Sequence, residues 1–238
     1  MVHEIFKRHK EAVLFYSGGK DSLCCLLLMR PYWDRLNVVW VDTGNQFPEV
    51  YEHMAKIKTL VPHFTTLRSN VPKYLYENGF PVDVVPTGAT VEGQRSFGKT
   101  KVTVCSRFDC CRNNIWEPMA RYFCAVRPTC VIRGDRGEER LEGPREFDGI
   151  EFAFPIFNWT VDQVLSVVHQ APEMWHPRLA MSEGSSLDCM SCMAYNSEHK
   201  SRMEYLRTHH PQLHRINVEF FRDYKAEVAR ELADLEDK

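Results

Sequence analysis

The chain has 238 residues, of which 44% are hydrophobic, so it can form one large domain or two small ones around a sizeable core. The net charge is −2 and the pI is near 6.6, which argues against a protein that binds polyanions over its whole surface. No apolar run reaches the roughly 18 residues that a membrane helix needs, and the segment Met1–Gly19 lacks the apolar core of a signal peptide. We therefore expect a cytoplasmic protein with no membrane partner.

Strand and helix patterns alternate along most of the chain. The apolar run Ala12–Tyr16 predicts a buried strand, and the leucine-rich stretch Ser22–Met29 predicts a helix that ends before Pro31. The alternation continues with a strand at Leu36–Val41, a helix at Phe47–Val61, a strand at Phe64–Leu67, a helix around Asn113–Ala125, a strand at Cys130–Arg133 and a helix at Thr160–His169 capped by Thr160. This order predicts an α/β fold, a parallel sheet with helices on both faces.

Two further segments differ in composition from this pattern. Gly88–Thr103 is polar, basic and contains glycine, which fits either a mobile loop over a site or an ordinary surface insertion. Asn217–Lys238 has the pattern of a charged amphipathic helix, which we expect to pack on a domain formed by residues 1–216.

The hexapeptide SGGKDS joins the first predicted strand to the first predicted helix. Its two glycines let the backbone approach an anion, and the helix N-terminus that follows presents free N–H groups and a positive dipole end. The serines add hydroxyl donors and the lysine a charge, whereas the aspartate is expected to cap the helix or hold Mg²⁺. The candidate phosphate-binding residues are Ser17, Gly18, Gly19, Lys20, Asp21 and Ser22.

This loop resembles the PP-loop of the ATP pyrophosphatases and adenine-nucleotide α-hydrolases. Three later segments resemble the phosphoadenylyl-sulfate (PAPS) reductase family of that superfamily. Asp42–Glu49 (DTGNQFPE) is similar to its DTGxxFPET segment, and Phe154–Gln163 (FPIFNWTVDQ) to its PLxxWTxxDV segment. Ile132–Arg140 (IRGDRGEER) resembles the stretch that binds the phosphate or sulfate end of the nucleotide, with Glu139 in place of the family's serine.

The resemblance covers roughly residues 12 to 195 and implies a PP-loop fold with an adenine-nucleotide site. It implies nucleotide-binding roles, in addition to the phosphate loop, for Asp42, Thr43, Gly44, Arg133, Gly134 and Arg140. Asp42, at the carboxyl end of a predicted strand, is placed to meet a ribose or a metal, or else serves as a turn or cap. The candidate catalytic residues are Lys20, Asp21 and Arg136.

The chain has nine cysteines, an odd number, whereas a secreted disulfide framework usually has an even number. Those in apolar runs, Cys24, Cys25, Cys124 and Cys130, are expected in the core. Cys105 lies in a polar loop and is open to interpretation as a nucleophile, a spare ligand or an inert thiol.

The remaining cysteines form two pairs, Cys110-Cys111 and Cys189-x-x-Cys192, which together can hold zinc or an iron–sulfur cluster. An adjacent pair suits a wide four-iron cube better than one tetrahedral ion. The arrangement resembles the CC…CxxC motif of [4Fe–4S] adenylyl-sulfate reductases, with Arg112 matching a basic residue of the motif and Asn113 replacing its lysine. We expect one [4Fe–4S] cluster on these four residues.

Two departures from the reductases determine the functional interpretation. The catalytic cysteine of the reductases lies in a C-terminal tail, whereas this sequence has no cysteine after Cys192. The phosphate loop of the reductases is degenerate, whereas the loop of this sequence keeps Lys20 and Asp21. We therefore expect an enzyme that uses ATP and Mg²⁺, held near Asp21 or Asp42, to adenylate an acceptor with release of pyrophosphate, in sulfur transfer. The acceptor is a tRNA, a DNA or a small molecule, which the basic segment Arg95–Lys101 is placed to meet.

Two alternatives remain. One is an adenylyl-sulfate or phosphoadenylyl-sulfate reductase, and the other is a non-catalytic nucleotide-binding Fe–S protein. The expected partners also include a sulfur donor or thiol-redox protein and a second copy of the chain in a homo-oligomer.

Overall fold

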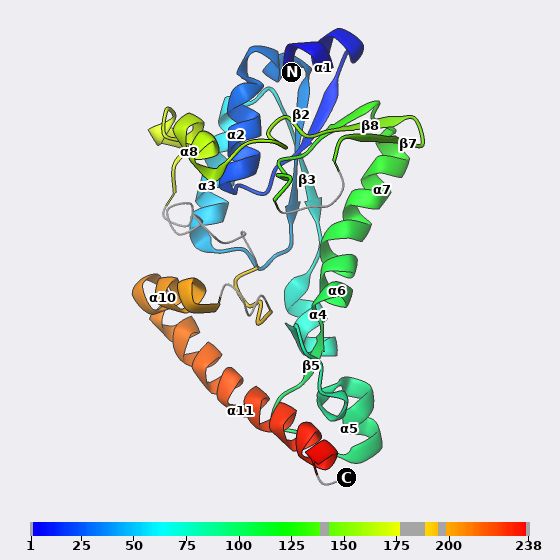
Figure 1. The fold of residues 1–238 in the computed structure, drawn as a ribbon, viewed down its shortest axis with the longest axis vertical. Coiled ribbons are helices and arrows are strands. Elements are labelled where there is room, and N and C mark those ends of the chain that lie inside the picture. Colours follow the sequence, from blue (N-terminus) through cyan, green and yellow to red (C-terminus); the bar gives the residue numbers. More distant parts are fainter. Residues whose placement is uncertain (1, 139–142, 177–188, 195–198, 237–238) are drawn as a thin grey trace. The chain divides into compact units, whose positions relative to one another are not determined.

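The computed structural model describes residues 2–138, 143–176, 189–194 and 199–236 (Figure 1). The chain divides into two compact units. The first unit comprises Met1–Asp42, Gln46–Arg68 and Pro118–Leu187, and the second comprises Thr43–Asn45, Ser69–Glu117 and Asp188–Lys238. The predicted division into a domain of residues 1–216 and a separate C-terminal helix stays a prediction. The boundary between residues 216 and 217 lies inside one helix, Pro211–Glu236.

The first unit is built on a six-stranded sheet in the order β3-β2-β1-β6-β8-β7. Its strands are β1 (Ala12–Phe15), β2 (Leu36–Asp42), β3 (His63–Arg68), β6 (Cys130–Ile132), β7 (Arg145–Phe147) and β8 (Ile150–Ala153). All neighbouring strands pair in parallel except β7, which is antiparallel to β8. The predicted α/β class and its four predicted strands are confirmed, whereas β7 and β8 were not predicted.

Helices cover both faces of this sheet. The helical segments of the unit are α1 (Val2–Arg8), α2 (Lys20–Leu28), η1 (Arg30–Arg35), α3 (Pro48–Leu60), α7 (Glu117–Val126, which enters from the second unit), α8 (Val161–Val168) and η4 (Pro172–Met174). In Figure 1, α2, α3 and α8 lie on one face of the sheet and α7 on the other. Thr160 caps α8 as predicted and forms a capping box with Gln163.

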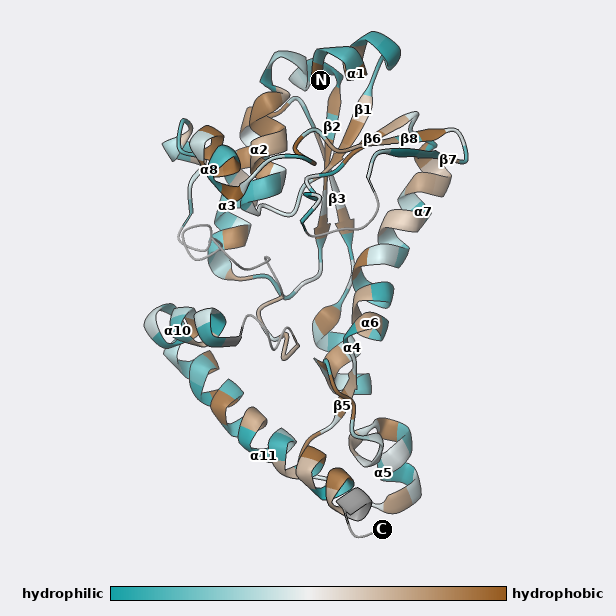
Figure 2. Ribbon diagram, in the orientation of Figure 1, coloured by the Kyte–Doolittle hydropathy of each residue, from teal (hydrophilic) through white to brown (hydrophobic). Residues whose placement is uncertain are grey.

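Burial explains why these strands form the centre of the unit. Leu14, Val38 and Val39 are fully buried, and β1 and β6 are coloured mainly as hydrophobic in Figure 2. Tyr122 of α7 packs against Val13 and Val39, so residues from β1, β2 and α7 share one cluster. The apolar runs of the sequence thus form strands buried on both faces, as parallel strands are.

The second unit combines helices with a small parallel sheet, β4–β5. Its elements are α4 (Val71–Asn78), β4 (Phe80–Val82), η2 (Thr87–Ala89), α5 (Val91–Phe97), β5 (Val104–Ser106), α6 (Arg107–Cys111), the π-helical turn η3 (Arg112–Trp116), α10 (His199–His209) and α11 (Pro211–Glu236). No helix within the described ranges is long and apolar enough to cross a membrane.

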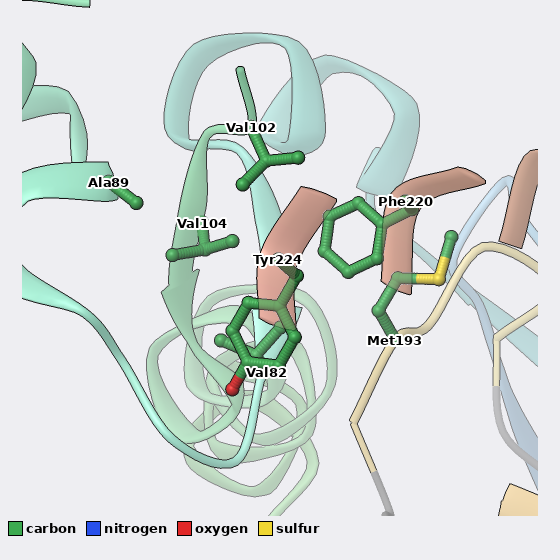
Figure 3. Close-up of a cluster of buried hydrophobic side chains, with 7 residues drawn as sticks. All are labelled: Val82, Ala89, Val102, Val104, Met193, Phe220 and Tyr224. Atoms are coloured by element: carbon green, nitrogen blue, oxygen red, sulfur yellow. The ribbon is translucent and has the colours of Figure 1, made fainter. Parts of the chain in front are cut away.

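Two expectations about this unit need correction. The segment predicted as a loop, Gly88–Thr103, contains α5, whose N-terminus is capped by the Thr90 side chain. The C-terminal helix begins at Pro211, earlier than predicted. Phe220 and Tyr224 of this helix join a buried cluster with residues of the β4–β5 sheet (Figure 3).

Candidate phosphate-binding and cysteine sites

Three segments singled out in the sequence follow the carboxyl ends of neighbouring parallel strands. The phosphate loop follows β1, Asp42 ends β2, and Arg133 follows β6. The chain runs from β1 to β2 on one side and places β6 on the other, so the strand order reverses between β1 and β6. Ligands of open α/β sheets bind at such a switch point.

The loop after β1 has the backbone geometry of an anion-binding turn. Gly18 has a φ of +83°, a left-handed conformation that favours glycine, and Gly19 is the N-cap residue of α2. The Gly19 N–H donates to Ser17 Oγ at 3.3 Å, and Ser17 Oγ lies 3.2 Å from Ser22 Oγ. The first turn of α2 has no side-chain cap, so the proposed role of Asp21 as a helix cap is wrong.

Asp21 instead bridges two buried cations. Its carboxylate lies 3.1 Å from Lys20 Nζ and 3.1 Å from Arg136 Nε. Lys20 is 5% exposed and Arg136 is 4% exposed, and Arg136 also pairs with Glu138 at 2.9 Å. The expected repulsion between Asp21 and phosphate is therefore offset by two positive charges that the carboxylate itself holds in place.

The segment after β6 packs directly against the start of α2. A Cβ at Gly134 would lie 2.9 Å from Asp21 C and 2.9 Å from Ser22 N, so only glycine allows this approach. Arg133 pairs with Asp135 at 2.7 Å. The predicted nucleotide ligand Arg140 and its neighbour Glu139 lie outside the described residues.

The DTG segment is divided between the two units. Asp42 belongs to the first unit, where its carboxylate accepts a hydrogen bond from Tyr51 Oη at 3.1 Å. Thr43 and Gly44 belong to the second unit, where Thr43 Oγ1 lies 3.3 Å from Cys189 Sγ. Thr43 therefore lies beside a cysteine, and its contact with a nucleotide stays a prediction.

All four predicted cluster ligands belong to the second unit. Cys110 and Cys111 end α6, and Cys192 N donates to Cys189 O at 3.0 Å, which closes the CxxC turn. Cys110 and Cys192 are buried, and Cys111 and Cys189 are half-buried. The two pairs therefore belong to the same unit, and their role as ligands of one cluster stays a prediction.

Polar groups that the sequence did not reveal hold this CxxC turn. Met190 N donates to Asn45 O at 2.7 Å, and Ser191 Oγ donates to Asn45 Oδ1 at 3.2 Å. On the other side, Arg202 Nη2 donates to Met190 O at 2.8 Å. The turn is therefore held on the segment that begins with Thr43.

A buried asparagine supports the other pair. Asn114 lies in the π-helical turn η3 and donates from Nδ2 to Cys110 O at 3.0 Å. Ser69 Oγ in turn donates to Asn114 O at 2.7 Å. π-Helical turns are frequent at functional sites, because the extra residue redirects the side chains before it.

The electrostatics of the thiols reflect their proximity. Burial, together with the charges of Cys105, Cys111 and Cys189, raises the pKa of Cys110 to about 12. Burial raises the pKa of Cys189 to about 11, partly offset by the Thr43 hydrogen bond. Ligand-free, these cysteines are thus protonated thiols, and metal binding would release their protons.

Two other observations bear on metal and thiol chemistry. Within the described residues, no three His, Cys, Asp or Glu side chains form a group that could hold a metal ion. Burial also raises the pKa of Cys105 to about 12, which opposes the nucleophile interpretation, since the thiolate is the reactive form. Cys24, Cys25 and Cys130 are buried as predicted, whereas Cys124 is exposed on α7, so its assignment to the core was wrong.

Comparisons with known proteins agree on the fold. The family model described as the phosphoadenosine phosphosulfate reductase domain matches residues 11–194. The structure is similar to that of phosphoadenylyl-sulfate (PAPS) reductase from Candida auris in a phosphate complex, with a TM-score of 0.52 and 16% sequence identity over 74% of this chain and 80% of that chain. No curated protein sequence matches significantly.

Proposed function

Because the chain belongs to the phosphoadenosine phosphosulfate reductase domain family, we propose that it is an enzyme that binds ATP through the phosphate loop of the first unit. The observation that carries this proposal is the Lys20–Asp21–Arg136 arrangement at the start of α2. It places two buried positive charges beside a helix N-terminus whose first N–H groups have no side-chain cap.

The arrangement suits a phosphate chain with a divalent cation. When a triphosphate binds, its oxygens replace the Asp21 carboxylate as partners of Lys20 and Arg136. Two charge-assisted hydrogen bonds to the carboxylate are thereby replaced by two to phosphate. Asp21 would then be a candidate to hold Mg²⁺, for which a carboxylate is a preferred ligand, and Asp42 at the end of β2 is the second candidate. The ion would neutralise part of the charge of the phosphates.

The proposed reaction is adenylation. A nucleophile of the acceptor bonds to the α-phosphorus, the bond to the bridging oxygen breaks, and pyrophosphate leaves with that electron pair. Lys20 and the N–H groups of the loop stabilise the negative charge that develops on the leaving phosphates. The acceptor class is a tRNA, a DNA or a small molecule activated for sulfur transfer.

The second part of the proposal concerns the cysteines. Cys110, Cys111, Cys189 and Cys192 would hold one [4Fe–4S] cluster, with Asn114 and Asn45 fixing the two ligand pairs. Four thiols are the donor set that this cluster type takes, although no three of them lie grouped as metal ligands within the described residues. With one cysteine for each iron, the cluster would supply a structural link between the two pairs.

A sulfonucleotide reductase is the second candidate function. The family description favours it, and so does the Candida auris PAPS reductase, whose phosphate complex supports an anion site in this fold. A non-catalytic nucleotide-binding protein is the third, and the buried Lys20–Asp21–Arg136 set argues against it.

The test measures product release with each nucleotide on anaerobically purified protein. We expect pyrophosphate release from MgATP in the presence of an acceptor, and weaker binding of adenylyl sulfate and phosphoadenylyl sulfate. Lys20→Ala should lose about 1.5–3 kcal/mol of MgATP binding, while Lys58→Ala, an exposed lysine on α3, serves as the matched control. Sulfite release with thioredoxin and no pyrophosphate release would establish the reductase instead.

Iron and acid-labile sulfide content test the cluster. About four of each per chain are expected, and Cys110→Ser, Cys111→Ser, Cys189→Ser and Cys192→Ser should each lower them. The control is Cys124→Ser, which changes an exposed cysteine of the first unit. Stoichiometric zinc without sulfide would exclude the cluster but keep the four ligands.

A further inference from the structure

Directly behind the phosphate loop, the first unit contains a buried column of three side chains: Tyr16, His53 and His176. Their exposed fractions are 2%, 2% and 5%. Tyr16 Oη is hydrogen-bonded to His53 Nε2, and the rings of His53 and His176 lie 4.7 Å apart. The column ends at the loop itself, where His176 Nε2 lies 3.1 Å from the carbonyl oxygen of Gly18.

The column contacts the loop on both sides of Ser17. Tyr16 precedes this serine, and its backbone N–H also donates to Val39 O at 2.9 Å, so its position is fixed by the sheet. Gly18 follows the serine and is held through its carbonyl. The Ser17 hydroxyl faces Ser22 of the same loop. Because Tyr16 and Gly18 are both held, the column fixes the backbone on either side of Ser17, a predicted phosphate ligand.

The hydrogen bond to Gly18 dictates the protonation of His176. A carbonyl oxygen can only accept, so Nε2 of His176 must carry the proton and donate it. The rest of the column is neutral. Burial, with smaller contributions from His176 and Lys56, lowers the pKa of His53 to about 3, and burial raises the pKa of Tyr16 well above its usual value.

The peptide between Gly18 and Gly19 is the group that needs such support. A peptide flanked by two glycines can rotate with little steric cost, because neither neighbour has a Cβ. Peptide groups are planar and trans, so the N–H of Gly19 points opposite to the carbonyl of Gly18. Holding that carbonyl on one side therefore aims the Gly19 N–H to the other side, where it meets Ser17 Oγ at 3.3 Å.

We propose that His176, backed by His53 and Tyr16, is a positioning residue that fixes the Gly18–Gly19 peptide, so that the Gly19 N–H holds the hydroxyl of Ser17, a predicted phosphate ligand, in place. The inference rests on the proposed function only in that the ligand of the loop is a phosphate chain. It does not depend on whether the nucleotide is ATP or a sulfonucleotide, nor on the identity of an acceptor.

The first test determines the tautomer of His176. Long-range ¹H–¹⁵N spectra of protein labelled with ¹⁵N-histidine show which ring nitrogen carries the proton, and His176→Gln identifies the resonance. The expected result is a ring protonated at Nε2. A neutral ring protonated at Nδ1 overturns the proposal, because that ring cannot donate to Gly18 from Nε2.

The second test measures binding by calorimetry, with MgATP, adenylyl sulfate and inorganic pyrophosphate as probes. His176→Ala should bind the preferred probe about five- to tenfold more weakly, since one neutral hydrogen bond is lost. His176→Gln should recover most of the affinity, because its amide nitrogen can take the place of Nε2 and donate to the same carbonyl. His169→Ala, which removes an exposed histidine of the same unit, is the control.

A third variant distinguishes positioning from packing. His176→Met fills space comparable to glutamine but has no donor, so a role in packing alone predicts that it matches His176→Gln, whereas the proposal predicts that it binds as weakly as His176→Ala. Wild-type affinity in His176→Ala, or a folded His176→Gln variant as weak as His176→Ala, overturns the proposal. If wild-type protein binds none of the three probes, the proposed function fails, whereas the spectra still support or overturn the hydrogen-bonded column.

Discussion

The buried His53 makes the stability of the first unit depend on pH. Its pKa falls from 6.5 in an unfolded chain to about 3 in the fold, chiefly through burial and then through His176 and Lys56. Between these two values the unfolded state binds the proton and the folded state does not. The stabilisation is therefore complete above pH 6.5 and decreases as the pH falls toward 3.

The magnitude follows from the same pKa values. Each pH unit in this interval removes about 1.4 kcal/mol, so lowering the pH from 6.5 to 5 costs about 2 kcal/mol. A loss of this size is a large fraction of the stability of a typical domain, which is about 5–15 kcal/mol. The matched variant is His53→Gln, which keeps a polar side chain but has no group that titrates in this range.

Urea unfolding followed by tryptophan fluorescence at pH 7 and pH 5 measures the effect. Four of the five tryptophans belong to the first unit, at positions Trp33, Trp40, Trp159 and Trp175. The wild-type protein should lose about 2 kcal/mol more than His53→Gln between the two pH values, at an unchanged dependence on urea. Equal losses in the two proteins would refute the assignment of a strongly lowered pKa to His53.

Three other predictions concern the supports of the two sites. Gly134→Ala should weaken nucleotide binding and lower the melting temperature, because its Cβ would lie 2.9 Å from the backbone of Asp21; calorimetry and thermal unfolding check both, and wild-type values would contradict the close approach. Thr160→Ala should cost about 1 kcal/mol of unfolding free energy by removing the cap of α8, measured by urea unfolding, and Thr160→Ser should restore most of it. Asn45→Ala should lower iron content at unchanged MgATP affinity, because it removes the acceptor for Ser191; full iron content would show that the turn needs no such support.

The parts of the fold that the sequence predicted are those with strong local signals. Ala12–Tyr16 and Leu36–Val41 are apolar runs bounded by polar residues, and they become central strands because only a sheet covered on both faces can bury them. The phosphate loop was equally accessible, because the strand, the glycines and the helix N-terminus are consecutive in the chain. Neither prediction required knowledge of a distant contact.

The features that the sequence did not predict depend on distant partners or on weak patterns. The segment Gly88–Thr103 is too polar to suggest a helix, yet Thr90 caps α5 and Val102 joins a buried cluster. The pairing of Asp21 with Arg136 joins residues far apart in the chain, so composition near either one does not reveal it. Single histidines such as His176 have no periodicity at all, and only the fold shows that this one ends at the phosphate loop.

The segment Asp42–Asn45 shows that consecutive residues of one motif can contact different parts of the protein. Read as a nucleotide-binding motif, it predicts one role for consecutive residues, yet the division between the units falls within it, after Asp42. Thr43 and Asn45 contact the CxxC turn, through Cys189 and through Met190 and Ser191. One peptide bond therefore joins a residue at the carboxyl end of β2 to residues that support the cysteine site. A substitution in this segment that lowers activity must be assigned by separate measurements of nucleotide affinity and iron content, because either site alone can account for the loss.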